Sequence, residues 1–151
     1  MRGAKALAAA AKDKPDTIPF ASTGVGSMPH LALELYQASA KVKFLHVPYR
    51  GGAPLLQDLV GGQIAATIPS IPSVLPLVKE GKFRALGYTG SRRAALHPEV
   101  PTIAELGYPG YEFSIYTGLV APAGTPREVI LRLHAALSRA RSSKELRDRF
   151  V

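Results

Sequence analysis

Past Pro15, the sequence alternates short runs of strand-forming residues with longer helical stretches, and this alternation limits the fold more than any other feature. We expect strands over residues 17–22, 44–49, 64–68 and 83–88, and helices over residues 27–40, 54–60 and 71–80. Pro29, Pro54 and Pro72 each fall in a first helical turn, where a missing amide costs little. Strands separated by helices favour right-handed crossovers. The sequence therefore predicts an α/β fold with a doubly wound, mostly parallel sheet.

Both ends of the chain predict further helices. Residues 1–12 are rich in Ala and Lys and predict a short surface helix that ends before Pro15. The apolar part of this segment is too short and too weakly apolar for a secretory signal. Near the other end, residues 113–121 predict an extended apolar run, and Thr125 predicts the N-cap of a helix that begins at Pro126. The apolar stripe of that helix comprises Val129, Ile130, Leu133, Ala136, Leu137 and Ala140.

Two shorter patterns complete the local predictions. Leu31, Leu35 and Ala38 share one face of the helix over residues 27–40. Thr102 and Glu105 predict a capping box, because a threonine and a glutamate three residues apart can bond each other's amides.

Charge and composition exclude several classes of site. The chain has no cysteine, so disulfides, thiolate metal sites and cysteine nucleophiles are excluded. The net charge of +8 lies mostly at the two ends, within residues 1–14 and 127–151. Nucleic-acid binding would need a basic stripe on a recognition element, and solvated helix faces explain these charges better. No pair of histidines has metal-ligand spacing, so we expect neither a metal nor a cofactor.

The turn at residues 22–27, Ser-Thr-Gly-Val-Gly-Ser, is the sharpest candidate site. Gly24 and Gly26 let the backbone turn tightly and let a ligand approach the amides, at the positive end of a helix. Ser22, Thr23 and Ser27 add hydroxyl groups. Together they predict a site for a carboxylate or phosphate, and an ordinary turn with a serine N-cap remains the alternative.

Two further turns follow the next expected strands. Tyr49 can offer a hydroxyl or a flat wall, and Arg50 can pair with a carboxylate, although most arginines in loops are solvated. Ser70 can donate a hydroxyl or cap the following helix. Because ligands of doubly wound sheets bind at the carboxyl ends of the strands, we expect the three turns to line one site.

Other known motifs fit poorly. A dinucleotide fingerprint would need glycine at position 29, and the phosphate-loop motif is absent. A serine hydrolase or acyl-transfer enzyme using Ser27 and His30 is the second candidate function. A base three residues along the same helix is badly aimed at the serine, so we expect His30 to pack under the loop or to bond its backbone.

The three turns, taken in order, resemble those of one known family. The segments that carry the resemblance are residues 21–32, 46–54, 58–63, 72–73, 81–86, 101–105 and 119–126. They are similar to those of the extracytoplasmic substrate-binding family of tripartite tricarboxylate transporters, also called the Bug family. The resemblance covers nearly the whole chain.

The resemblance implies a non-catalytic receptor whose two domains close on a small carboxylate and deliver it to membrane transporter subunits. It implies a periplasmic location and one lobe of a type II periplasmic-binding-protein fold, although the chain shows no signal peptide. Residues 1–112 would form the second, solute-binding domain, and residues 113–151 a crossover strand and helix that pack on an absent first domain. The exposed stripe of that helix predicts self-association through residues 113–140. The ligand-facing residues carried over are Ser22, Thr23, Gly24, Gly26, Ser27 and Ser70, with Tyr49 and Arg50 nearby.

Overall fold

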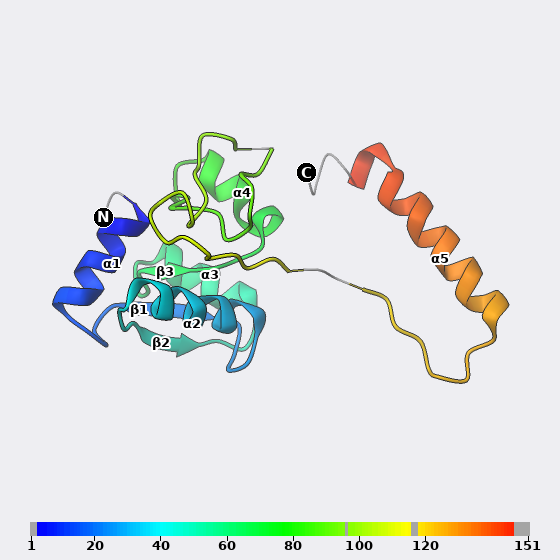
Figure 1. The fold of residues 1–151 in the computed structure, drawn as a ribbon, viewed down its shortest axis with the longest axis horizontal. Helices are drawn as coiled ribbons and strands as arrows, with labels where there is room; N and C mark the ends of the chain where they lie inside the picture. The colour runs from blue at the N-terminus through cyan, green and yellow to red at the C-terminus, as the bar shows by residue number, and fades with distance from the viewer. Residues whose placement is uncertain (1–2, 96, 116–117, 147–151) are drawn as a thin grey trace. The chain divides into compact units, whose positions relative to one another are not determined.

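A computed structural model describes residues 3–95, 97–115 and 118–146 (Figure 1). Its elements are α1 (Ala4–Asp13), β1 (Pro19–Ser22), α2 (Met28–Ala40), β2 (Leu45–Pro48), α3 (Gly52–Val60), β3 (Ala66–Thr67), α4 (Ile71–Lys79) and α5 (Arg127–Ser142). The chain divides into two compact units, residues 1–114 and 115–151. The roles expected for 1–112 and 113–151 stay predictions.

The first unit is built on a parallel three-stranded sheet of order β2-β1-β3. Ser22 at the end of β1 lies opposite Pro48 of β2, and Ala21 lies opposite Thr67 of β3. The three strands therefore run in register and end at one edge of the sheet. This arrangement confirms the predicted α/β class with a parallel sheet.

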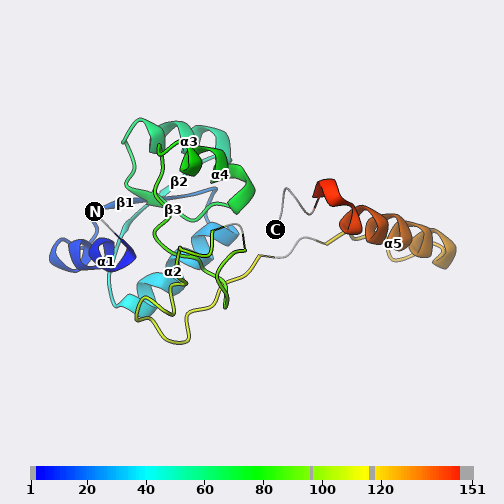
Figure 2. The ribbon, with the colours of Figure 1, turned by 90° about the horizontal axis from the view of Figure 1, so that it is seen from above.

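Helices cover both faces of the sheet, as a doubly wound fold requires. Phe20 packs with Leu33 and Tyr36 of α2 in the main core, which lies on one face. The next residue, Ala21, points to the other face, because side chains alternate along a strand, and it packs with Leu55 of α3. Figure 2 shows α2 and α3 on opposite sides of the sheet.

Helix α1 is part of the core and is not merely a surface helix, which corrects the sequence-based prediction. Ala4, Leu7, Ala8 and Ala11 are all buried. The alanines among them let the helix backbone come close to its neighbours. The Tyr36 hydroxyl donates a hydrogen bond of 2.9 Å to the carbonyl oxygen of Ala4.

The apolar face predicted for α2 is also wrong. Leu31 and Leu35 are 48% and 37% exposed, and the buried residues are Ala32, Leu33, Tyr36 and Gln37. Gln37 is tolerated in the core because its side-chain oxygen accepts the N–H of Phe44 at 2.7 Å. A bond to a residue beyond the helix thus pairs the polar side chain that α2 turns inward.

The fourth predicted strand, over residues 83–88, is not formed. The structure has only an isolated parallel bridge between Tyr88 and Thr102 at this place. Thr102 does form the predicted capping box: its amide donates to the Glu105 carboxylate at 2.8 Å, and the Glu105 amide donates to its hydroxyl at 3.1 Å. The box closes a hydrogen-bonded turn, and no helix follows it.

The second unit contains α5, which begins one residue later than predicted. Pro126 occupies the N-cap position, while the Thr125 hydroxyl donates to the carbonyl of Pro122 at 2.8 Å. The expected extended run over 113–121 forms no strand in the part that the structure describes, and positions 116–117 lie outside that part. The apolar stripe of α5 is exposed. Among the described helices, none has the length and apolar character needed to cross a bilayer.

Candidate functional site

The three predicted turns meet at the carboxyl edge of the sheet. They are the connections β1–α2, β2–α3 and β3–α4, whose helices have Ser27, Gly51 and Ser70 at their N-cap positions. With the strand order β2-β1-β3, the chain reverses its direction across the sheet between β1 and β3. Sheets of this order bind ligands in the crevice at that switch point. The fold thus brings the three turns together where a ligand site is expected.

The loop over residues 22–27 uses several of its own amides. Gly24 and Gly26 have φ angles of 132° and 77°, which favour glycine. The Gly24 amide donates to the Ser22 hydroxyl oxygen at 3.2 Å, and the Gly26 amide donates to Nδ1 of His30 at 3.0 Å. The amide of Ser27 donates to the carbonyl of Gly24 at 3.2 Å. Some of the amides that the two glycines were predicted to leave open for a ligand therefore already donate hydrogen bonds within the protein.

What remains open in the loop lies at its tip. Thr23 is exposed, and Val25 is 77% exposed. Among the described residues, no acceptor is found for the amides of Thr23 and Val25. These two amides are therefore open in the part of the chain that the structure describes.

The two serines of the loop are engaged within it. Ser22 is fully buried, and its hydroxyl oxygen lies 2.7 Å from Nε2 of His46. The Ser27 hydroxyl donates to the carbonyl of Gly24 at 2.7 Å and makes no cap bond to α2. Ser22 consequently supports the loop from beneath, whereas Ser27 holds it closed at the start of α2.

Two histidines stack beneath the loop. The rings of His30, on α2, and His46, on β2, have centroids 4.1 Å apart and planes inclined by 20°. Nε2 of His30 lies 3.6 Å from the carboxylate of Glu34, one turn further along α2. The bond from Gly26 to His30 confirms that His30 contacts the loop backbone. Sequence reasoning missed His46, because only the pairing of β2 with β1 brings it to Ser22.

The second candidate function, a hydrolase, is not supported by this geometry. Ser27 donates to Gly24, and His30 accepts from Gly26, so the two side chains make no hydrogen bond to each other. Ser22 does contact a histidine, but it is fully buried and closed to substrate. A nucleophile must be both paired with its base and reachable.

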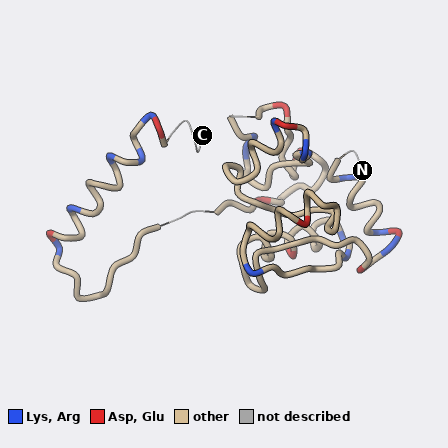
Figure 3. Tube along the Cα trace, turned by 180° about the vertical axis from the view of Figure 1, so that it is seen from behind, with Lys and Arg blue, Asp and Glu red and all other residues tan. Residues whose placement is uncertain are grey.

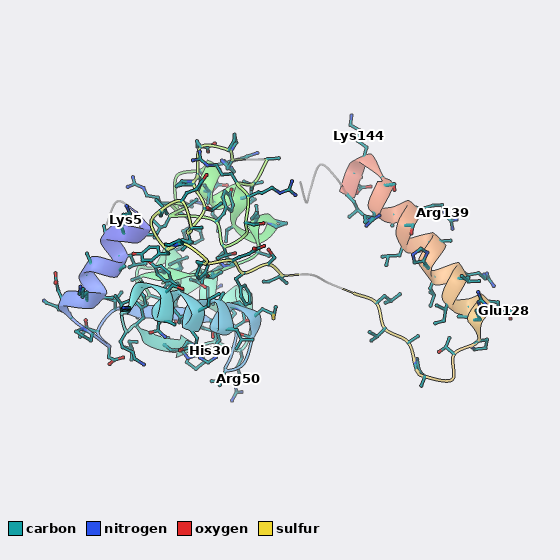
Figure 4. The ribbon with its side chains drawn as sticks, in the orientation of Figure 1. Lys5, His30, Arg50, Glu128, Arg139 and Lys144 are labelled. Atoms are coloured by element: carbon teal, nitrogen blue, oxygen red, sulfur yellow. The ribbon has the colours of Figure 1, made fainter. Side chains whose placement is uncertain are left out.

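The second turn provides one engaged side chain and one free one. The Tyr49 hydroxyl donates to the Asp58 carboxylate of α3 at 2.7 Å, and this bond raises the pKa of Tyr49. Arg50 is exposed and makes no hydrogen bond or ion pair within the described residues. Figure 4 shows its side chain reaching outward from the loop. Arg50 is therefore a cation at this edge that has no partner among the described residues.

The third turn presents Ser70 at the N-cap position of α4. Its hydroxyl lies 3.2 Å from that of Ser73, which donates to the Ser70 carbonyl at 2.7 Å. Ser70 is exposed, so its hydroxyl can reorient toward a ligand. Two hollows of about 360 and 420 Å³ lie away from the three turns, beside the end of α2 and around His97.

Acidification should destabilise the protein through His46. Burial, followed by the nearby charge of His30, lowers the pKa of His46 below its usual value of 6.5. The unfolded chain then binds more protons than the folded one, so stability falls as the pH drops from about 6.5 through the folded pKa. Urea unfolding between pH 8 and pH 5 measures this loss. His46→Gln should flatten the profile, whereas the same change at exposed His134 should leave it unchanged.

Comparison with known proteins gives one consistent family. Residues 2–150 match the family model described as "Tripartite tricarboxylate transporter family receptor". The chain is 45% identical to the "UPF0065 protein in tcbD-tcbE intergenic region" of Pseudomonas sp. (strain P51), over 89% of this chain and 40% of that protein.

Solved structures of similar fold include carboxylate complexes. Rpa4515 of R. palustris with adipate has a TM-score of 0.90 and 33% identity, over 96% of this chain and 48% of that one. MatC of Rhodopseudomonas palustris with bound malate has a TM-score of 0.89 and 34% identity, over 98% and 50%. The periplasmic binding protein BugD has a TM-score of 0.90 and 31% identity, over 99% and 50%. The chain thus spans half or less of the length of each of these proteins.

Proposed function

The chain belongs to the tripartite tricarboxylate transporter receptor family, and from that membership we propose that its α/β unit is the ligand-binding lobe of a non-catalytic solute receptor. The ligand is a small carboxylate, the class seen in the similar proteins with adipate and malate. The observation that carries the proposal is the meeting, at one edge of a parallel sheet, of three helix-opening turns and Arg50, which has no partner in the described part of the chain.

The residues of the site take different roles in this proposal. Thr23 offers its free amide and hydroxyl, Arg50 its charge, and Ser70 its hydroxyl. Gly24 and Gly26 supply the left-handed turns that expose the tip of the loop. The remaining members act as supports that hold the loops in place, and these are Ser22, Ser27 and Tyr49.

The rest of the receptor follows from the family. Residues 113–151 would pack on a first domain, and the closed receptor would pass its solute to membrane transporter subunits in the periplasm. A two-domain receptor draws contacts from both lobes and excludes water when it closes. One lobe offers only part of those contacts, so we expect weak affinity for this chain alone.

A chemical-shift titration tests the proposal. The ¹⁵N-labelled chain is titrated with adipate and, separately, malate, and we expect shifts confined to residues 22–27, 49–51 and 68–70. The matched control is 1,6-hexanediol, which has the length of adipate without its charges and should cause none. Shifts spread over basic α5 instead, whose Lys and Arg residues Figure 3 marks in blue, would mean unspecific anion binding and would contradict the proposal.

Self-association is a separate expectation that rests on α5. Val129, Ile130, Leu133 and Leu137 form an exposed apolar stripe on this helix, and such stripes favour pairing. Light scattering at rising concentration should show the mass increasing above that of a monomer. Leu133→Gln should lower the association, and Arg132→Gln on the same helix should not. A monodisperse monomer at high concentration would contradict the expectation.

A further inference from the structure

We infer that His30 and His46 are positioning residues of the ligand loop: they hold residues 22–27 in the shape that presents the tip amides, and protonation of His30 at Nδ1 releases that shape. The inference deepens the proposed function. It rests on the proposed function only in taking residues 22–27 as a ligand-binding loop. Its evidence is a set of contacts among the described residues that ties the loop at two points to α2 and β2. Neither histidine is a predicted ligand contact.

The first tie runs through His30. Its Nδ1 accepts the Gly26 amide at 3.0 Å, so in this structure Nδ1 carries a lone pair and not a proton. We assign the ring proton to Nε2, which faces Glu34 at 3.6 Å. Protonated histidine has two N–H donors and no acceptor. When Nδ1 takes a proton, the ring and the Gly26 amide become two donors facing each other, and the bond is lost.

The second tie runs through His46 and Ser22. The Ser22 hydroxyl, 2.7 Å from His46, also accepts the Gly24 amide at 3.2 Å. His46 thereby holds the Ser22 hydroxyl in place, and that hydroxyl in turn holds Gly24. The His46 ring stacks on the His30 ring with centroids 4.1 Å apart, so the two ties meet at one pair of rings. Both glycines thus depend on one pair of rings.

The groups around the two rings indicate that residues 22–27 keep their shape when His30 and His46 are neutral. Glu34 on α2 faces His30, β2 contributes His46, and β1 contributes the uncharged Ser22. A proton on each ring would place like charges at stacking distance, which only Glu34 would offset. The loop should therefore keep its shape when His30 is neutral and lose the bond at Gly26 when His30 is charged.

Nuclear magnetic resonance on the ¹⁵N-labelled chain tests this without any ligand. At pH 8 we expect the His30 ring to show an unprotonated Nδ1 and a protonated Nε2. When the pH is lowered until the His30 ring is protonated, the amide proton of Gly26 should shift with the same midpoint as the ring. A proton on Nδ1 at pH 8, or a Gly26 amide that ignores the titration of His30, would overturn the inference.

Variants separate positioning from general stability. His30→Asn keeps an acceptor oxygen close to the place of Nδ1, so Gly26 should hold its pH 8 shift throughout. His30→Leu has no acceptor, so Gly26 should show the acidic wild-type shift even at pH 8. His134→Leu is the matched control and should change neither. If His30→Leu does not fold, the tautomer of the His30 ring at pH 8 and the Gly26 shift in His30→Asn still test the inference. Unchanged Gly26 in folded His30→Leu would contradict the inference.

Adipate added at pH 8 keeps the two proposals apart. If adipate shifts none of the three turns in the wild-type chain, the proposed function fails while the result at Gly26 stands. If adipate binds but the Gly26 amide does not follow His30, the positioning role fails and the proposed function stands.

Discussion

Leu33→Ala should lower the free energy of unfolding by about 2 to 5 kcal/mol, the range for deleting a fully buried leucine. Leu33 has no exposed surface and packs in the main core with Phe20 and Tyr36. Removing its side chain opens a cavity between α2 and the sheet. Urea denaturation followed by circular dichroism measures the loss, which is a large share of a typical domain's stability.

The matched control is Leu31→Ala on the same helix. Leu31 is 48% exposed, so its removal should cost far less than that of Leu33. Both substitutions make the same chemical change in α2, and they differ in which face they alter. Equal losses for the two variants would mean that α2 presents a different face to the core.

Arg50→Gln should weaken carboxylate binding roughly 10- to 100-fold, because a hydrogen bond to a charged group contributes about 1.5 to 3 kcal/mol. Arg50 has no partner among the described residues, so its removal leaves no buried group unsatisfied. The fold should therefore be unaffected. Because the chain alone is expected to bind weakly, the measurement is the loss of the adipate-induced chemical shifts of the three turns at concentrations that shift them in the wild type.

Arg84→Gln supplies the control for charge alone. Arg84 is exposed, lies in the same unit, and lines the hollow around His97 rather than the edge of the sheet. It lowers the net charge by the same amount as Arg50→Gln. If both variants weaken binding equally, the ligand responds to the overall charge of the lobe and Arg50 is no specific contact.

The sequence was most informative where backbone chemistry is local. Pro29 and Pro72 marked helix starts correctly because proline fits a first turn for reasons contained in its own ring. The capping box at Thr102 was also predicted, since both of its bonds span three residues. The three turns of the site followed from the order of strands and helices.

Prediction failed where distant residues decide. The segment 83–88 has the composition of a strand, yet it forms none. Gly87 lies so close to Ile103 that a Cβ added at Gly87 would be 2.7 Å from Cδ1 of Ile103. The inward face of α2 includes Gln37, a polar residue whose partner Phe44 lies beyond the helix. The bond of Ser22 to His46 was missed for the same reason, because only the pairing of β2 with β1 brings the two residues together.

The hydrogen bond from Tyr36 to Ala4 joins α1 to the main core of the first unit. Trimming the chain at Pro15 to obtain a smaller protein for crystallisation would remove α1 from that core. The trimmed protein would lose the acceptor of the Tyr36 hydroxyl and would expose the apolar surface that α1 covers, which favours aggregation.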